Sequence, residues 1–181
     1  MAICDSEHGN LEIYDFSGHQ RGWEILTEGY DNGTIVLPDF VNFSRNLATE
    51  AVHVANSPPL RPPDKDVVVV TDPHFNTLLV HEVVGHPSEM DRALKYETSY
   101  AGRSWFLKDL NDNQVGQQIA SPLVNAYSDP TIEGFGSFKY DHDGTPARRA
   151  YHIRDGNFEE FLNNRQTAAI MGAEPNGSAR A

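Results

Sequence analysis

The chain has 181 residues, of which 39% are hydrophobic and 22% are charged. This composition is typical of a folded domain, or of two small lobes, and excludes a disordered chain. The formal net charge of −12 argues against direct binding to nucleic acid, because such a surface repels phosphate. No apolar run approaches the ~18 residues of a membrane helix. Residues 1–10 lack the basic and apolar regions of a signal peptide, so we expect a cytoplasmic protein with no membrane partner.

The chain contains one cysteine, Cys4. A single cysteine cannot form an internal disulfide, and it cannot build a cysteine-rich zinc site. Any metal bound by this chain must therefore depend mainly on histidine and carboxylate ligands.

The first third of the chain predicts strands, turns and one helix. Residues 11–16 alternate apolar and polar side chains, which is the pattern of a half-buried strand, and residues 29–33 predict a turn. Ser44 is expected to cap a helix that ends near Asn56. The proline-rich residues 57–63 exclude a regular helix and favour a stiff connector, with a ligand for a proline-binding domain as the alternative.

The middle of the chain predicts a strand followed by a helix. Residues 66–71 are rich in valine and predict a strand that is buried on both faces. Asp72 suits a helix N-cap and Pro73 suits the first helical position, so a helix is expected over residues 73–85. Its apolar stripe, which should face the core, consists of Phe75, Leu78, Leu79 and Val83.

Residues 117–162 predict a region rich in strands. Turn sequences at residues 143–146 and 155–156 are expected to connect neighbouring strands. A short helix over residues 164–171 should end at Gly172. The expected strands cover residues 124–127, 135–140, 147–153 and 157–162.

The expected central helix ends in an HExxxH pattern at residues 81–86. His81 and His86 are five positions apart, about 140° around an ideal helix, which is a poor spacing for two ligands of one ion. The helix must therefore deform if both imidazoles are to bind the same metal. Gly85 and Pro87 favour such a deformation, either a π-bulge or a helix end.

Glu82 falls on the apolar stripe of this helix, where a carboxylate needs a compensating partner such as a metal ion. Two imidazoles and a third ligand would hold Zn²⁺ with one position left for water. Glu82 would then act as the general base of a peptidase. From the spacing alone, a metal site and a structural histidine cluster both remain open.

Three further residues have two interpretations each. Glu89 and Asp91 are either solvated loop acids or acceptors that orient a ligand imidazole from the second shell of a metal site. His142 belongs to a surface turn or acts as a substitute metal ligand.

Several segments, taken in order, resemble the TldD/PmbA family of HExxxH metallopeptidases, which are described as modulators of DNA gyrase. The resemblance implies that His81 and His86 bind zinc, that Glu82 is the catalytic glutamate, and that the chain is of the catalytic, TldD-like type. The segments that carry the resemblance are residues 22–24, 67–70, 78–86, 89, 91, 143–146, 171–172 and 175–177.

The resemblance also implies an α+β fold with a strand-rich C-terminal half. We therefore expect residues 1–181 to form one incomplete metallopeptidase domain, with possible sub-lobes at residues 1–63 and 64–181. Family members are longer, and their third zinc ligand is a cysteine near the C-terminus, which Cys4 does not match in position. The resemblance implies a homo- or heterodimer with a family subunit and an unfolded protein or peptide as substrate. The alternative is a non-catalytic subunit or remnant that acts as an interaction module.

Overall fold

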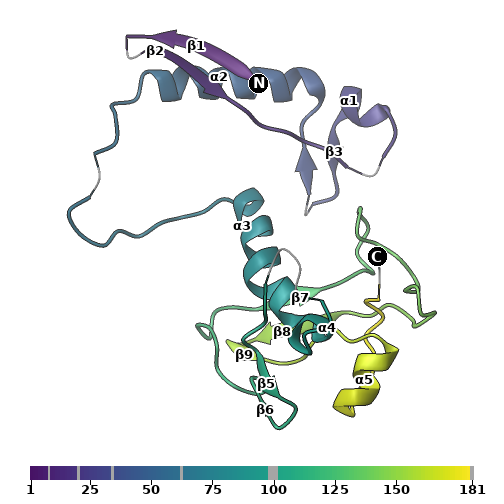
Figure 1. The fold of residues 1–181 in the computed structure, drawn as a ribbon. Helices are drawn as coiled ribbons and strands as arrows, with labels where there is room; N and C mark the ends of the chain where they lie inside the picture. The colour runs from purple at the N-terminus through teal and green to yellow at the C-terminus, as the bar shows by residue number, and fades with distance from the viewer. Residues whose placement is uncertain (8, 20, 34, 62, 98–101, 180–181) are drawn as a thin grey trace. The chain divides into compact units, whose positions relative to one another are not determined.

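The structure is a computed structural model, and it combines helices and short strands in an α+β arrangement (Figure 1). The chain divides into two compact units, Met1–Val68 and Val69–Ala181. No helix among the described residues is both long and apolar enough to cross a membrane. The residues that the structure describes are 1–7, 9–19, 21–33, 35–61, 63–97 and 102–179.

The first unit packs a hairpin against a long helix. β1 (Ala2–Ser6) pairs antiparallel with β2 (Gly9–Ile13), and both strands contact α2 (Phe40–Ala55). Figure 1 shows the hairpin lying along this helix. β2 overlaps the strand expected over residues 11–16, whereas β1 was not predicted. The helix buries small and aliphatic residues at four-residue spacing: Leu47, Ala51 and Ala55.

The predicted start of this helix at Ser44 is wrong. The helix begins at Phe40, and Asp39 is its N-cap because its carboxylate accepts hydrogen bonds from the amides of Val41 and Asn42. Two amides satisfied by one carboxylate make an effective helix start, so the hydroxyl of Ser44 is not needed as a cap.

Three short elements precede α2. They are α1 (Glu24–Glu28), β3 (Tyr30–Asp31) and β4 (Val36–Leu37). β3 and β4 form a small antiparallel hairpin, so the turn expected over residues 29–33 overlaps its first strand and loop.

The valine-rich strand predicted over residues 66–71 is absent. Val67–Val70 are between 58% and 94% exposed, and no described residue pairs with them as a strand. β-branched residues favour a strand mainly through packing and ladder pairing with a neighbour, and this run has neither. The preceding described residues 57–61 and 63 also lack regular structure, as their prolines predict.

The second unit begins with a continuous helical stretch of changing geometry. It runs through α3 (Pro73–Val80), the π-helical segment η1 (His81–Gly85), the 3₁₀ turn η2 (His86–Ser88) and α4 (Met90–Ala93). The helix expected over residues 73–85 is therefore present, but its last five residues are not α-helical.

A three-stranded antiparallel sheet lies beside this stretch. Its order is β7 (Ala126–Ser128), β8 (Ala150–Arg154) and β9 (Asn157–Phe158). The expected β8–β9 turn is confirmed, because Asp155 and Gly156 have positive φ angles of 48° and 82°, as a tight hairpin of this type requires.

Other predictions for this half differ in detail. Residues 135–140 do not form a strand, apart from an isolated bridge between Tyr140 and Pro146. A hairpin of β5 (Leu107–Asp109) and β6 (Asp112–Asn113) was not predicted.

The C-terminal helix α5 (Arg165–Met171) is confirmed together with both of its ends. The side chain of Asn164 accepts from the amide of Thr167, whose hydroxyl accepts from the amide of Asn164. Gly172 ends the helix with a φ of 67°, a conformation that glycine adopts without strain.

The core of the second unit is aromatic. The ring centroids of Phe106 and Phe158 are 4.5 Å apart, and those of Phe158 and Phe161 are 4.9 Å apart. This cluster joins α4 to the strands, and its buried members are Met90, Ala93, Phe106, Leu107, Phe158 and Phe161.

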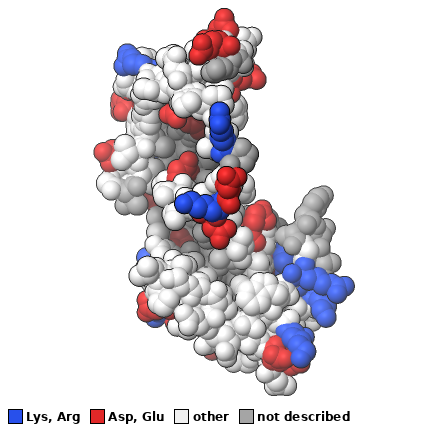
Figure 2. All heavy atoms as spheres, turned by 90° about the vertical axis from the view of Figure 1, so that its left-hand side faces the viewer, with Lys and Arg blue, Asp and Glu red and all other residues white. Residues whose placement is uncertain are grey.

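Charged side chains are scattered over one face of the molecule. On the face that Figure 2 shows, basic side chains form several separate groups, with acidic groups and broad uncharged areas between them.

Candidate metal centre

The helix that carries the HExxxH residues starts as the sequence predicts. The carboxylate of Asp72 accepts a hydrogen bond of 2.6 Å from the amide of Phe75, and Pro73 occupies the first turn. These two features fix the start of α3. They therefore also set the direction in which the side chain of residue 81 leaves the helix axis.

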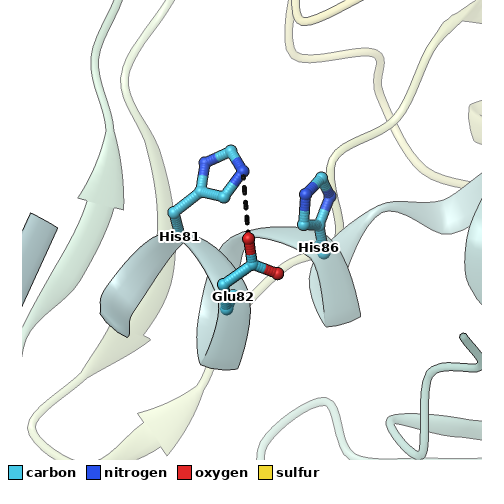
Figure 3. Close-up of side chains that lie close together, drawn as sticks. All are labelled: His81, Glu82 and His86. Carbon is cyan, nitrogen blue, oxygen red and sulfur yellow. Dashed lines mark ion pairs between the residues drawn. The ribbon is translucent and has the colours of Figure 1, made fainter. Parts of the chain in front are cut away.

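The helix deforms at the two histidines, as predicted from their spacing. The amide of His86 donates to the carbonyl of His81, which is the five-residue hydrogen bond of a π-helix. This bond places His86 above His81 on the same side of the helix. The two ring centroids are 4.4 Å apart and the ring planes meet at 78°. In Figure 3 both imidazoles extend from the helix on the same side.

Glu82 completes the cluster. One atom each from His81, Glu82 and His86 can be chosen such that all three lie within 4.8 Å of one another. The carboxylate lies 4.0 Å from Nε2 of His81, as the dashed line in Figure 3 marks. Two imidazole nitrogens with a carboxylate beside them suit a zinc site, so the residues present fit such an ion.

The prediction that Glu82 lies on a buried stripe is wrong. The side chains of His81 and Glu82 are 58% and 53% exposed, and no residue of α3 is buried. The apolar side chains Phe75, Leu78, Leu79 and Val83 are exposed as well. An amphipathic pattern shows which face a helix can bury, but no described residue of the unit Val69–Ala181 covers this face.

Glu89 contacts His86 directly. Both of its carboxylate oxygens lie 3.1 Å from Nδ1 of His86, and Nε of Arg92 donates to one of them at 2.9 Å. A carboxylate bound to Nδ1 favours the tautomer that leaves Nε2 free to bind a metal. Asp91 differs, because its carboxylate accepts from the backbone amide of Arg92.

Three residues near the cluster were not singled out from the sequence. Arg92 is buried and holds Glu89, while Ser88 and His152 are buried and hydrogen-bonded to each other at 2.9 Å. Ser88 and His152 are 64 positions apart, so no local pattern connects them. The one available signal was the position of His152 inside an expected strand among apolar residues.

His142, the substitute ligand considered from the sequence, does not join the cluster. Among the described residues, the group of histidine, cysteine and acidic side chains at this point consists of His81, Glu82 and His86 alone.

Comparison with known proteins places these features in a family. A family model described as the PmbA/TldA metallopeptidase C-terminal domain matches residues 64–181. The chain belongs to the TldD/PmbA family. Its α+β fold agrees, since a Thermotoga maritima protein described as a candidate modulator of a DNA gyrase superposes with a TM-score of 0.56. That match has 18% identity and covers 77% of this chain and 30% of the other, so it supports the fold alone.

Relatives within the TldD/PmbA family are named as metalloproteases. A metalloprotease of Methanothermobacter thermautotrophicus is 34% identical over 173 residues, which are 94% of this chain and 35% of that protein. A zinc metalloprotease TldD homologue of Saccharolobus solfataricus is 28% identical over 115 residues, covering 62% of this chain and 23% of that protein. The chain thus spans about a third or less of the length of these two relatives.

Proposed function

We propose that this chain carries the catalytic core of a zinc-dependent peptidase, with His81 and His86 as zinc ligands and Glu82 as general base. The observation that carries the proposal is the π-helical segment His81–Gly85, which brings two imidazoles five positions apart to within 4.4 Å. A π-helical turn is rare and often occurs at functional sites. The metalloprotease names of the relatives support the same conclusion.

The roles of the residues follow from their positions. A bound zinc ion would supply a Lewis acid that polarises a peptide carbonyl and acidifies a water molecule. Glu82, beside both imidazoles, would accept a proton from the attacking water and deliver it to the leaving amine as the peptide C–N bond breaks. Glu89 would hold Nδ1 of His86, so that Nε2 of this residue serves as the ligand atom.

The substrate and the partner belong to the same proposal. The half-exposed His81 and Glu82 are accessible to an extended chain, which fits an unfolded protein or peptide as substrate. We propose assembly with a second TldD/PmbA-family subunit, either the same or different, in the cytoplasm. The proposal assigns two protein ligands to the zinc ion, and Asp91 is not one of them.

The test is to measure zinc content and proteolysis together on the purified chain. We expect about one zinc per chain and cleavage of an unfolded substrate such as casein. Glu82→Gln should keep the zinc but lose about 10²–10⁴-fold in rate, because the amide cannot accept the proton. Glu50→Gln, an exposed change on α2, serves as the matched control.

Absence of both zinc and proteolysis in the wild-type chain would reject the proposal. It would favour a non-catalytic subunit that retains the fold as an interaction module. Proteolysis that survives in Glu82→Gln would reject the role of Glu82 while leaving the metal ligands in place.

A further inference from the structure

A buried chain of hydrogen bonds connects the strand β8 to the end of the π-helical segment. The hydroxyl of Ser88 donates to the carbonyl of Gly85 at 2.7 Å, and its oxygen lies 2.9 Å from Nδ1 of His152. On the other side of the ring, Nε2 of His152 lies 2.7 Å from the hydroxyl of Ser128 in β7. Ser88 and His152 are 0% and 2% exposed, so water cannot substitute for these partners.

For a neutral ring, only one arrangement of protons satisfies every member of this chain. Because the hydroxyl proton of Ser88 is used on Gly85, Nδ1 of His152 must carry a proton and donate it to the oxygen of Ser88. A neutral imidazole then has a lone pair on Nε2, which accepts from Ser128. Burial lowers the pKa of His152 to about 4, which keeps the ring neutral at physiological pH.

The carbonyl of Gly85 lies where the helix changes from π-helical to 3₁₀ geometry. In a continuous α-helix it would accept from the amide of Glu89, but that amide donates to His86 instead. Pro87, which has no N–H, prevents a regular continuation of the ladder. The Ser88 hydroxyl adds a side-chain hydrogen bond at the last residue of the π-helical segment, where the regular α-helical ladder is interrupted.

Backbone bonds hold the same point to the rest of the unit. The carbonyl of Ser88 accepts from the amide of Leu162 at 2.7 Å, and the carbonyl of Leu162 accepts from Met90 at 3.0 Å. Ser104 donates its hydroxyl to the carbonyl of Pro87. Displacement of Ser88 would therefore move His86, which lies two positions earlier, relative to His81.

We propose that His152 is a positioning residue of the metal centre, which acts through Ser88 to hold His86 in register with His81. The inference rests on the proposed function, because it assigns His152 to the same site. It extends that function by assigning a residue that has no contact with the three clustered side chains. Residues that orient metal ligands typically change metal affinity by about 10–100-fold when they are removed.

The chain offers a matched pair of serines for the test. Ser137 donates its hydroxyl to the carbonyl of Gly134, which is the same three-residue bond to a glycine that Ser88 makes. Ser137→Ala therefore removes an equivalent bond outside the metal centre. His152→Phe removes the ring nitrogens while keeping an aromatic ring, and Ser88→Ala provides a milder change if that variant does not fold.

Two measurements on these variants test whether His152 holds His86 in position. The first is the zinc dissociation constant, obtained by competition with a chromophoric chelator. The second is the hydrogen-exchange protection of the His86 amide, which reports the bond to His81 without any metal. We expect Ser88→Ala and His152→Phe each to weaken zinc binding by about 10-fold or more and to reduce this protection. Ser137→Ala should leave both quantities at the wild-type values.

The double variant Ser88→Ala/His152→Phe should bind zinc only slightly more weakly than either single variant, because both changes break the same chain of hydrogen bonds. Unchanged zinc affinity and unchanged His86 protection in folded Ser88→Ala would overturn the inference. If the wild-type chain binds no zinc, the proposed function fails, and the exchange measurement alone still decides whether His152 holds the segment.

Discussion

The HExxxH residues lie between two stretches of chain that have very different support. On the N-terminal side, α3 buries none of its residues, and its large apolar side chains are 44–61% exposed. On the C-terminal side, Ser88, Met90 and Ala93 are no more than 3% exposed. The two imidazoles follow this division, since the side chain of His81 is 58% exposed and that of His86 is 24% exposed.

The difference shows how the candidate site is built. His86 is fixed from outside its helix by Glu89, by Arg92 through Glu89, and by the segment that follows it. His81 is positioned mainly by the backbone of the helix that precedes it. One ligand is thus held by tertiary structure and the other by local helix geometry, so substitutions on the two sides should have unequal effects.

Truncation of one apolar side chain on each side should show the largest contrast. Met90→Ala should lower the free energy of unfolding by about 2–5 kcal/mol, because it leaves a cavity in the aromatic core. Leu78→Ala on α3 should change the free energy by less than about 0.5 kcal/mol, because the side chain is already exposed. Urea unfolding of both variants measures the two effects. Equal losses would mean that α3 is packed in solution, and the comparison would then fail.

Acid should lower the free energy of unfolding, because the buried ring of His152 resists protonation in the folded chain. Because burial lowers its pKa to about 4 from 6.5, the unfolded chain binds a proton between these values that the folded chain does not. The free energy of unfolding should therefore fall by about 3 kcal/mol as the pH falls from about 6.5 to about 4. Unfolding curves over this range should show the decrease in the wild-type chain and a much smaller one in His152→Phe.

The nearby carboxyl of Glu160 contributes to the decrease only at the acidic end of this range. Glu160 is the charged group that acts on His152, and its negative charge slightly favours the protonated ring. Burial raises the pKa of Glu160, but the hydrogen bond and the charge of Arg148 lower it by more. The pKa of this carboxyl is therefore below its ordinary value. A decrease of the same size in His152→Phe would show that another group is responsible.

The two acidic residues that follow the motif should differ in their effect on zinc. Glu89→Gln removes the charge that faces Nδ1 of His86 and should weaken zinc binding by about 10–100-fold. Asp91→Asn should have little effect, because that carboxylate bonds to a backbone amide instead. Chelator competition on both variants provides the measurement. A larger effect of Asp91→Asn would mean that the contacts of the two acids are exchanged when metal is bound.

The sequence predicted those features whose causes lie close together along the chain. The cap formed by Asp72, the deformation between His81 and His86, and the ends of α5 all depend on residues within a few positions of one another. The turn at Asp155 and Gly156 is of the same kind.

Features that depend on distant partners were predicted poorly. The valines of residues 67–70 and the stripe on α3 suggested burial, but hydrophobicity states only that a surface can be buried, and not that a neighbour covers it. Ser88 and His152 were missed for the related reason that tertiary structure alone brings them together. In the candidate site, the clustered residues were therefore predictable, while the residues that support them were not.

Gly85 gives the smallest expected effect and tests the explanation of the deformation. The sequence suggested that glycine permits the π-bulge, yet Gly85 has φ −58° and ψ −66°, which are angles that any residue adopts in a helix. A Cβ added there would meet nothing closer than the carbonyl of Val80 at 3.9 Å. Gly85→Ala should therefore be neutral or stabilise the fold by up to about 1 kcal/mol, because alanine favours helices more than glycine does.

Zinc affinity measured by the same competition should stay within about twofold of the wild-type value in Gly85→Ala, as for other substitutions without steric conflict. Such a result would assign the deformation to Pro87 and to the bond between Ser88 and Gly85, both of which are unchanged in this variant. A loss of zinc affinity of about 10-fold or more would instead show that metal binding requires backbone angles at Gly85 that differ from those observed. In that case, the part of the helix that carries His81 would move when zinc binds.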